Sequence, residues 1–457
     1  MIGDAIARGE IAVIGLGRSG TAAARLLARE GGRVYASDAG GGAAVAQAAA
    51  ALRADGIDAD AGRHDLARIR GAALVIASPG VPPSAEPLGA AREAGVRVVG
   101  ELEVALHALR GVPYIAITGT NGKSTVTALV AHLLTALGHR AVAAGNIGRA
   151  LSDVALSAER PAWIALEVSS FQLHDTPSLR PAVGVLTNLS PDHLDRYATI
   201  DDYYADKALL YRNAGPASRW VLNADDDAAL RLARGAAGER WMFSRRDASA
   251  AAHFDAALDA LVLFDEPFVA RGSLPLLGWH NVENVLAAAL AVSVADAAHR
   301  TPNARAALAV GAATFGGLPH RLEVVAESHG VRWINDSKAT NVSSARVAIE
   351  AMDRPTIVLL GGKHKGEPYT SLIDPLVAHA KLVIAYGAAE SIVAADLEGR
   401  VPIERGGSSF EDVMQRARAA ASPGDAVLLA PACSSFDMFT NYEARGNAFR
   451  RLAREGA

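Results

Sequence analysis

The chain has 457 residues, which is too long for one ordinary hydrophobic core and predicts two to four domains. Half of the residues are hydrophobic and 21% are charged, a balance that excludes an intrinsically disordered chain. The formal net charge of −4 gives no general reason to expect nucleic acid or an anionic membrane as a partner, although a local phosphate site can still be basic.

The sequence gives no sign of export or of membrane insertion. Residues 1–8 lack a positive region followed by an apolar stretch, and no apolar run reaches the roughly 20 residues that span a bilayer. The single cysteine, Cys433, permits no intrachain disulfide and suits a reducing compartment. We therefore expect a cytoplasmic protein.

Short β-forming runs alternate with Ala- and Leu-rich helical stretches along almost the whole chain, which predicts βαβ units and parallel sheets. In the first block the expected strands are 11–14, 33–36, 74–77 and 97–99, with helices such as 21–30 between them. In the second block they are 114–117, 163–168, 183–187 and 220–223, with a helix over 124–137.

The rest of the chain is divided by two less regular stretches. Residues 245–272 predict a hairpin-bearing insertion or a mobile segment, and the Gly-Gly-Leu-Pro at 316–319 suits a linker. The third block has expected strands at 331–334, 356–360, 382–385 and 426–429 and a closing helix at 441–454. We expect an α/β protein with three domains in series, at 1–100, 101–316 and 317–457.

A first glycine-rich turn, Gly-Leu-Gly-Arg-Ser-Gly at 15–20, follows a strand and opens a helix, and Asp38 ends the next strand. Such a turn lets backbone approach a diphosphate at a helix N-terminus. The motif alone fits an NAD-dependent dehydrogenase, another nucleotide, or a turn without a ligand. It indicates a diphosphate near Ser19 and Gly20 without identifying the nucleotide.

A second glycine-rich turn is more informative. Residues 118–125 read Thr-Gly-Thr-Asn-Gly-Lys-Ser-Thr, directly after a strand and at a helix start. Backbone N–H groups can cradle phosphates there, Lys123 can reach the terminal ones, and the Ser124 hydroxyl can ligate Mg²⁺. The leading glycine lies closer to the lysine than in the strict P-loop pattern. An NTP site is favoured over a solvated lysine, and a dehydrogenase has no need of it.

With these two turns, the sequence resembles the Mur ligase family, and within it the branch that adds D-glutamate in peptidoglycan precursor synthesis. The resemblance covers essentially the whole chain. The motifs that carry it, besides the second turn, are 145–148 (Gly-Asn-Ile-Gly), 167–173 (Glu-Val-Ser-Ser-Phe-Gln-Leu), 188–197 (Asn-Leu-Ser-Pro-Asp-His-Leu-Asp-Arg-Tyr), 280–284 (His-Asn-Val-Glu-Asn), 318–321 (Leu-Pro-His-Arg), 335–341 (Asn-Asp-Ser-Lys-Ala-Thr-Asn), 431–437 (Pro-Ala-Cys-Ser-Ser-Phe-Asp) and 445–447 (Arg-Gly-Asn).

The resemblance implies a Rossmann-like N-terminal domain for a UDP-sugar, a central P-loop ATPase-type parallel-sheet domain, and a Rossmann-like C-terminal domain that receives the amino acid. The implied reaction phosphorylates the alanyl carboxylate of UDP-N-acetylmuramoyl-L-alanine with ATP and two Mg²⁺ ions. The amine of D-glutamate then attacks the acyl phosphate, giving an amide, ADP and phosphate. We expect a monomer that binds no nucleic acid and does not insert into membranes.

The resemblance also assigns roles to single residues. The residues expected to bind ATP are Gly119, Thr120, Asn121, Gly122, Lys123, Ser124, Thr125, Asn281, Asn284, Arg321 and Asp336. Those expected to bind the UDP-sugar are Ser19, Gly20, Asp38, Ser78, Gly80 and Asn146. Those expected to bind D-glutamate are Thr340, Lys365, Ser435 and Tyr442.

The catalytic set implied by the resemblance is Lys123, Glu167, His193, Lys207 and Lys338. Ser124, Glu167, His193 and Lys207 are the expected metal ligands. Lys207 lies at the Tyr-x-x-x-Lys spacing of a lysine that CO₂ carbamylates in the family, which turns a cation into a carboxylate-like ligand. Lysine and histidine at such positions are otherwise solvated surface residues.

Three departures from the family pattern stand out. The turn at 361–366 reads Gly-Gly-Lys-His-Lys-Gly, so Lys363 could compete with Lys365, although an exposed turn lysine is the simpler interpretation. Tyr442 stands where Phe is frequent, which leaves its hydroxyl unexplained. Residues 39–41 (Ala-Gly-Gly) offer the uridine no basic or hydroxyl side chain. Cys433 has no activating base nearby and is expected to be a buried thiol.

Four rival functions stay open on the residues alone. A sibling ligase would need a different signature in the third block, and a folylpolyglutamate synthetase should lack the first domain. An NAD-dependent dehydrogenase leaves Lys123 and Glu167 idle. A non-catalytic nucleotide-binding module leaves the whole catalytic set without a purpose.

Overall fold

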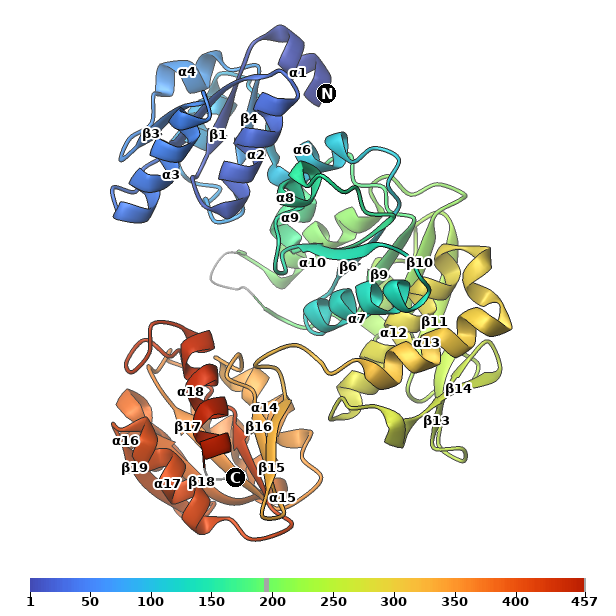
Figure 1. The fold of residues 1–457 in the computed structure, drawn as a ribbon, viewed down its shortest axis with the longest axis vertical. Helices are drawn as coiled ribbons and strands as arrows, with labels where there is room; N and C mark the ends of the chain where they lie inside the picture. The colour runs from blue at the N-terminus through green and yellow to red at the C-terminus, as the bar shows by residue number, and fades with distance from the viewer. Residues whose placement is uncertain (193–196, 456–457) are drawn as a thin grey trace. The chain divides into compact units, whose positions relative to one another are not determined.

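The computed structural model describes residues 1–192 and 197–455 and contains three sheets, each flanked by helices (Figure 1). The chain divides into two compact units. The first comprises Met1–Arg271 with Glu283–Ala312 and holds the first two sheets. The second comprises Gly272–Val282 with Ala313–Ala457 and holds the third sheet. The expected α/β architecture with three parallel-rich sheets is confirmed.

The first sheet has five parallel strands in the order β3-β2-β1-β4-β5. Its strands are β1 (Glu10–Ile14), β2 (Arg33–Asp38), β3 (Asp58–Ala61), β4 (Leu74–Ala77) and β5 (Val98–Gly100), and its helices are α1 (Ile2–Arg8), α2 (Arg18–Arg29), α3 (Ala43–Ala54), α4 (Leu66–Gly71) and α5 (Glu86–Glu93). The strand order reverses at β1 and β4. A crevice opens at the carboxyl ends of the strands at such a point, which is where open α/β sheets bind ligands.

The second sheet has nine strands in the order β14-β13-β12-β11-β10-β9-β6-β8-β7. They are β6 (Tyr114–Thr118), β7 (Ala141–Gly145), β8 (Trp163–Glu167), β9 (Val183–Leu186), β10 (Arg219–Asn223), β11 (Glu239–Ser244), β12 (Ala252–Asp255), β13 (Ala260–Leu263) and β14 (Glu266–Ala270). The helices of this part are α6 (Glu101–Ala108), α7 (Lys123–Ala136), α8 (Leu151–Leu156), α9 (Ser170–His174), α10 (Ile200–Ala208), α11 (Asp227–Leu232), α12 (Trp279–Ala295) and α13 (Pro302–Thr314).

Residues 245–272 differ from the expectation of an insertion or mobile segment. The hairpins are present, but β12 pairs parallel with β11, and β13 and β14 follow antiparallel. They therefore extend the main sheet. Leu261 and Leu263 are buried, so side-chain packing holds these short strands in place.

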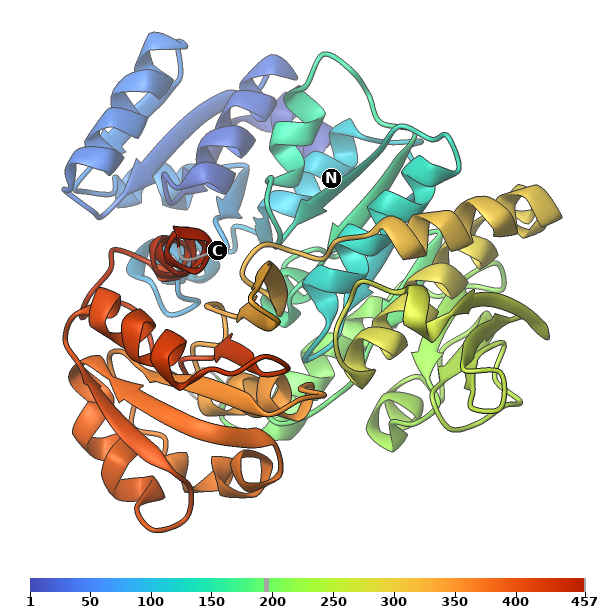
Figure 2. The ribbon, with the colours of Figure 1, turned by 60° about the horizontal axis from the view of Figure 1, so that its bottom comes forward.

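The third sheet has six strands in the order β15-β16-β20-β17-β18-β19, and β15 alone among them runs antiparallel to its neighbour. They are β15 (Glu323–Ser328), β16 (Val331–Asn335), β17 (Thr356–Gly361), β18 (Ala380–Tyr386), β19 (Ile403–Gly407) and β20 (Ala426–Leu429), with helices α14 (Val342–Glu350), α15 (Ile373–His379), α16 (Glu390–Leu397), α17 (Phe410–Ala420) and α18 (Tyr442–Glu455). Helix α18, in red, packs on β15 and β16 (Figure 1) and is seen nearly end-on beside the C-terminus in Figure 2.

Both faces of the central strands are buried. In β17, Val358 and Leu360 belong to one apolar cluster, whereas Ile357 and Leu359 belong to another on the opposite face. This is why the strand reads as a continuous apolar run instead of an alternating one. Within the described part of the chain, no helix is both long and apolar enough to cross a membrane.

Candidate active site

The second glycine-rich turn connects β6 to α7 at the carboxyl edge of the second sheet. Gly119 and Gly122 have φ angles of +142° and +81°. A side chain at either position would also collide, at Gly119 with the Thr187 hydroxyl and at Gly122 with the Asn284 amide oxygen. The Lys123 ammonium donates a hydrogen bond to Thr120 O over 2.7 Å. The sequence thus specifies a tight turn at a helix start, the geometry that binds phosphate.

This turn is fastened to the segment after β9, the strand beside β6. Asn121 N donates to the Asn188 side-chain oxygen over 2.8 Å, and the Thr187 hydroxyl donates to Asn121 O over 2.6 Å. The Thr120 hydroxyl donates to Ser190 O over 3.1 Å. Because these bonds hold the turn from one side, its backbone is ordered in advance. Ser124 is half-buried and Thr125 buried in the first turn of α7.

Glu167 ends β8, on the other side of β6, and is 2% exposed. Its Oε1 atom accepts a hydrogen bond from Asn146 Nδ2 over 2.8 Å. Its Oε2 atom is buried and has no hydrogen-bond partner among the described residues. Leaving a buried carboxylate oxygen unpaired is costly, so the position fits a cation that the described residues do not supply.

Asn146 was predicted to contact the UDP-sugar. In the structure its side-chain amide donates a hydrogen bond to Glu167. Its backbone N–H also donates to Glu167 O over 3.0 Å. Asn146 thus holds this carboxylate in one orientation. It lies just after β7, the next strand along, so its nearness follows from the sheet order β6-β8-β7.

Lys207 lies in α10 and is 1% exposed. Its Nζ atom donates a hydrogen bond to Gly119 O over 2.8 Å and lies 4.7 Å from the ring centroid of Tyr203. Burial lowers the pKa of the Lys207 amine well below its ordinary value, and the nearby Lys123 ammonium lowers it further. The carboxylates of Asp192, Asp206 and Glu167 oppose this shift.

The structure thus gathers the second turn, Glu167 and Lys207 at one edge of one sheet. Their donors and acceptors fit a magnesium nucleotide: backbone N–H groups and a lysine for phosphate, and a hydroxyl and an unpaired carboxylate oxygen for the ion. The expected ligand His193 lies outside the described residues.

A cavity of about 530 Å³ opens at the carboxyl edge of the first sheet, at the point where the strand order reverses. The predicted residues Ser19, Asp38, Ser78 and Gly80 line it. Gly20 is not among the described residues that line it, and a side chain there would collide with Gly15 O and the Ser78 hydroxyl. The Ser78 hydroxyl donates to Gly15 O over 3.1 Å, which joins the two strand ends that form the crevice.

Asp38 has a structural task in addition to lining this cavity. Its two carboxylate oxygens accept backbone hydrogen bonds from Leu16 N and Gly40 N, each over 2.8 Å. Arg18 and His64 also line the cavity and were missed by the sequence reasoning. Arg18 stands inside the first glycine-rich turn and could have been found there, whereas His64 follows β3 and carries no motif.

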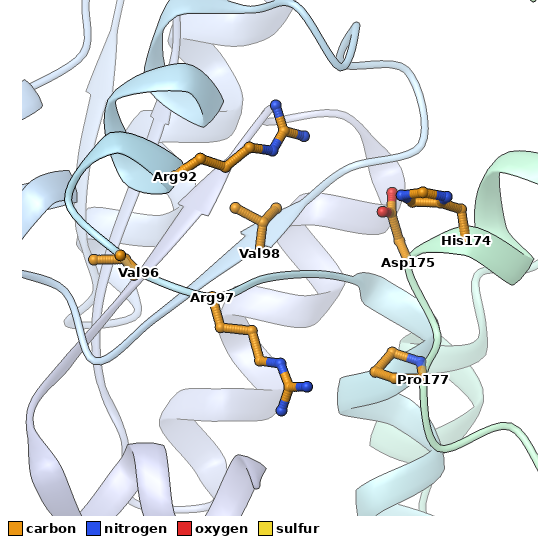
Figure 3. A pocket seen from close by; sticks show the side chains of 8 residues that line it. Arg92, Val96, Arg97, Val98, His174, Asp175 and Pro177 are labelled. Atoms are coloured by element: carbon orange, nitrogen blue, oxygen red, sulfur yellow. The ribbon is translucent and has the colours of Figure 1, made fainter.

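A second pocket, of about 410 Å³, lies where β5 meets the end of α9 (Figure 3). Arg92 and Arg97 project along it from one side, and His174 and Asp175 face it from the other. His174 Nδ1 is 2.9 Å from Asp206 Oδ1, and this contact raises the pKa of His174. This pocket therefore adjoins the helix that carries Lys207.

In the second unit, predicted site residues follow the carboxyl ends of three neighbouring parallel strands, β16, β20 and β17. Asp336 follows β16, and burial raises the pKa of its carboxyl to about 7, opposed by Arg321. Thr340 accepts a hydrogen bond at its hydroxyl from Lys365 Nζ over 3.4 Å. Lys365 is exposed in the turn after β17.

The segments after β17 and β20 are paired with each other. Lys363 N donates to Ser434 O over 2.8 Å, and Ser434 N donates back over 3.2 Å. Lys363 is exposed, as the simpler interpretation predicted. Ser435 is 3% exposed. Cys433 is fully buried 2.9 Å from the Tyr369 hydroxyl, and burial raises the pKa of its thiol, which suits no nucleophilic role.

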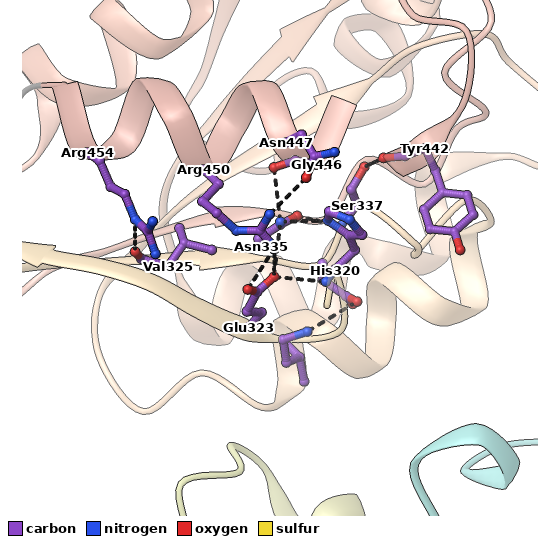
Figure 4. A network of polar contacts seen from close by, with 12 residues as sticks. His320, Glu323, Val325, Asn335, Ser337, Tyr442, Gly446, Asn447, Arg450 and Arg454 are labelled. Atoms are coloured by element: carbon purple, nitrogen blue, oxygen red, sulfur yellow. Dashed lines mark hydrogen bonds and ion pairs between the residues drawn. The ribbon is translucent and has the colours of Figure 1, made fainter. Parts of the chain in front are cut away.

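A buried polar network joins helix α18 to the segments on either side of β15 and β16 (Figure 4). Asn335 Nδ2 lies 3.0 Å from His320 Nδ1 and donates to Gly446 O over 3.1 Å. A side chain at Gly446 would collide with the His320 ring. Arg450 forms two 2.8 Å contacts with the Glu323 carboxylate. The network explains why the motifs at 318–321, 335–341 and 445–447 occur together.

Arg445 clamps the same region from inside. It is fully buried, its Nε donates to the Ser337 hydroxyl over 3.0 Å, and its Nη2 donates to Ser337 O and Cys433 O. Ser337 in turn donates to Tyr442 O over 2.8 Å. The start of α18 is thereby fixed relative to Lys338, whose Nζ donates to the Tyr442 hydroxyl over 3.1 Å.

Asn281 and Asn284 both lie on α12 and are buried. Asn284 packs on Gly122 of the phosphate turn, whereas Asn281 Nδ2 donates to Leu277 O over 2.7 Å. The boundary between the two compact units falls between them, so Asn281 belongs to the second unit and Asn284 to the first. The spacing of three residues correctly predicted a shared helix.

Three family models match the chain in sequence: the Mur ligase MurD-like N-terminal domain over residues 9–100, the Mur ligase middle domain over 117–292, and the Mur ligase glutamate ligase domain over 320–433. Together they span most of the chain. The chain belongs to the Mur ligase family. Members of this family are ATP-dependent amide-bond-forming ligases that use Mg²⁺.

Similar curated proteins are named UDP-N-acetylmuramoylalanine–D-glutamate ligase. The protein of Anaeromyxobacter dehalogenans is 41% identical to this chain, and the match covers 98% of each. That of Acidobacterium capsulatum is 40% identical, with 97% of this chain and 95% of the relative covered. That of Salinibacter ruber is 40% identical, with 99% of both covered.

Solved structures share the fold at lower identity. A pseudomurein peptide ligase type C from Methanothermus fervidus and a UDP-N-acetylmuramate–alanine ligase from Thermotoga maritima each superpose with a TM-score of 0.61. Each is 18% identical, over 98% of this chain and 100% of the solved one. These likenesses establish the three-domain fold and nothing finer.

Proposed function

We propose that this chain joins D-glutamate to the alanyl carboxylate of UDP-N-acetylmuramoyl-L-alanine, forming an acyl phosphate from ATP and releasing ADP and phosphate. The substrates are those in the names of relatives about 40% identical over nearly the whole chain. The observation that carries the chemistry is the buried Oε2 of Glu167, which no described residue pairs, at a sheet edge shared with a phosphate-binding turn.

In this proposal the second turn binds the ATP phosphates. The backbone of Gly119, Thr120, Asn121 and Gly122 faces the phosphates, and Lys123 neutralises the terminal one, which reduces its repulsion of the substrate carboxylate. Thr125, in the first turn of α7, is proposed to bind the ATP phosphates as well. Asn281, Asn284, Arg321 and Asp336 are proposed to bind the rest of the nucleotide.

Ser124, Glu167, carbamylated Lys207 and His193 would hold two Mg²⁺ ions, which supply charge neutralisation at the phosphates when bound. Asn146 orients Glu167 by occupying Oε1 and leaving Oε2 for a cation. It is therefore a positioning residue, and it is also proposed to bind the UDP-sugar together with Ser19, Gly20, Asp38, Ser78 and Gly80.

Lys207 is suited to carbamylation because its depressed pKa leaves the amine neutral at lower pH than an exposed lysine. The neutral nitrogen attacks the carbon of CO₂, an N–C bond forms, and one proton leaves to solvent. The product is an anion in place of a cation. This change also removes the repulsion between Lys207 and Lys123.

Lys338, Thr340, Lys365 and Ser435 are proposed to bind the amino acid and the acyl phosphate, together with Tyr442. Lys365 takes the side-chain carboxylate, and Lys338 faces the reacting group. The domain boundaries near residues 100 and 316, a cytoplasmic location and a monomeric state belong to the same proposal.

The test is phosphate release from magnesium ATP with UDP-N-acetylmuramoyl-L-alanine, comparing D-glutamate, L-glutamate and no amino acid. Release that requires both substrates and prefers D-glutamate is the expected result. Preference for L-glutamate would keep the mechanism and change the product. No release in any mixture would refute the proposal and turn attention to folate substrates.

A further inference from the structure

Two histidines of the first compact unit meet at the amino edge of the second sheet, opposite the edge that carries the phosphate turn. His139 lies between helix α7 and the start of β7, and His299 lies in the 3-10 turn η3 (Ala297–Arg300) after helix α12. Their Nε2 atoms are 2.9 Å apart. His299 is 4% exposed, whereas His139 is half-buried, so solvent reaches the pair from the His139 side.

A backbone contact determines which nitrogen of His299 carries a proton. Its Nδ1 atom lies 2.8 Å from Val292 O, and a carbonyl oxygen can only accept, so Nδ1 is the donor. The lone pair of the neutral ring is then on Nε2, the atom that faces His139. A hydrogen bond from the other ring nitrogen to a backbone carbonyl is the arrangement that orients histidines as metal ligands.

The spacing of the two Nε2 atoms matches two neighbouring ligands of one metal ion. Nitrogens bound at about 2.05 Å and at an angle of about 90° lie about 2.9 Å apart. The ring centroids, now 5.0 Å apart, would approach to about 4.5 Å, so the rings must tilt slightly. His139 can tilt because it is half-buried and lies outside any helix or strand. Its Nε2 proton moves to Nδ1, a shift between neutral tautomers, and the metal ion replaces the hydrogen bond.

The charged surroundings are compatible with a divalent cation. Burial, followed by the His299 ring, lowers the pKa of His139, so its ring is neutral at neutral pH, the form that binds metal. The Asp296 carboxylate opposes this shift and also attracts a cation. The neighbouring arginines are engaged elsewhere, Arg140 with a glutamate and Arg300 over a tryptophan ring. Among the described residues no third histidine, cysteine or carboxylate completes a ligand cluster, so water must fill the other positions.

We propose that His139 and His299 form a binding site for a divalent late transition metal ion such as Zn²⁺. Imidazole nitrogen suits Zn²⁺, Ni²⁺ and Cu²⁺, whereas Mg²⁺ prefers oxygen ligands, so magnesium does not compete for this site. Helix α7 begins at the phosphate turn, where Asn284 of α12 packs on Gly122. The ion therefore ties together, at their other ends, two helices that already meet at that turn.

The first experiment measures Zn²⁺ binding to the full-length protein by calorimetry in excess Mg²⁺, for the wild type, His139→Gln and the control His132→Gln. His132 is half-buried on α7, so the control removes an imidazole from the same helix. Loss of one of the two protein ligands should weaken Zn²⁺ binding by on the order of 100-fold. The control should bind Zn²⁺ like the wild type, and all three proteins should have similar unfolding temperatures without Zn²⁺.

A second experiment locates the ion without changing its ligands. The Trp163 ring lies 6.3 Å from the ring of His139 and 5.8 Å from that of His299, measured between centroids. Cu²⁺ bound by the pair should quench the fluorescence of this tryptophan. Trp163→Phe should lose that quenching, while its calorimetric affinity for Zn²⁺ stays at the wild-type level.

Three outcomes would overturn the inference. They are the absence of saturable Zn²⁺ binding to the wild type, equally tight binding to His139→Gln, and Cu²⁺ quenching that is unchanged in Trp163→Phe. The last would place the ion elsewhere in the protein. These measurements do not involve catalysis, so their failure would leave the proposed function untouched.

Discussion

The Nζ atom of Lys207 donates a hydrogen bond to the carbonyl oxygen of Gly119 over 2.8 Å, inside the protein. Residues 88 positions apart in the chain thus meet at the turn that follows β6. One hydrogen bond to a carbonyl does not compensate for burying a full positive charge. Lys207 is therefore a destabilising residue in its unmodified form, as expected of a group kept for chemistry.

Replacing Lys207 with Met should raise stability and abolish activity. The pKa of Lys207 is depressed in the folded chain, so the unfolded chain binds the proton more strongly. The loss of stability caused by burying Lys207 is largest at low and neutral pH. It disappears as pH rises toward the pKa of lysine in the unfolded chain, about 10.4. Thermal unfolding should show a gain for Lys207→Met near pH 7 that shrinks by pH 10, and phosphate release should fall by on the order of 100-fold or more.

Isotope-labelled bicarbonate provides the matching chemical test of this lysine. A carbamate signal in the NMR spectrum of the wild type should be absent from Lys207→Met. An active Lys207→Met variant would contradict both the ligand role and the carbamate.

Glu167→Gln should retain the fold and lose activity. The amide oxygen can still accept the hydrogen bond from Asn146, but the group that replaces Oε2 carries no charge for a cation. We expect phosphate release to fall by on the order of 100-fold, with a higher Mg²⁺ requirement. Glu103→Gln is the matched control, because Glu103 is 3% exposed and accepts a bond from Ser178 N. Equal losses in the two variants would contradict the metal role.

Asp336→Asn should change how stability depends on pH. Burial raises the pKa of Asp336 to about 7, so the folded chain holds the proton more tightly than the unfolded chain. The wild type therefore loses stability as pH rises from about 4 to 7, up to about 4 kcal/mol at 1.4 kcal/mol per pH unit. Denaturant titrations should find Asp336→Asn similar to the wild type at pH 4 and more stable at pH 8. An equal difference at both pH values would exclude the shifted pKa.

Gly446→Ala should destabilise the third domain, because the added methyl group collides with the His320 ring. Overpacking of this kind costs about 1–3 kcal/mol. His320→Ala removes the obstacle, so the double variant should lose less stability than the sum of the two single changes. Strict additivity in urea unfolding would show that the two side chains do not compete for space.

The expected strands are present within about two residues wherever an apolar run lies between turn residues, because such runs are buried on both faces. The strand at 74–77 was predicted with its observed limits, as was that at 426–429. Polar or Gly-rich strands were missed, such as β3 (Asp58–Ala61) and β19 (Ile403–Gly407), since they lie at sheet edges and carry little apolar signal.

The motifs located the site segments, but not the task of each side chain within them. Asn146 stands in a motif assigned to the sugar, and only the strand order places its amide on Glu167. The hydroxyl of Tyr442 was unexplained until the structure brought Lys338 within 3.1 Å. Such contacts join residues 21 and 104 positions apart, which local periodicity does not encode.

The chain has one thiol, and Cys433 is wholly enclosed beside Tyr369. Maleimide reagents should therefore not react with Cys433 in the native protein, so that a cysteine-free variant is not needed. New cysteines placed on exposed positions of each compact unit, such as Leu258 and Val377, would be labelled selectively. A donor and acceptor dye at these two sites would then report, by energy transfer in solution, how the units respond to each substrate.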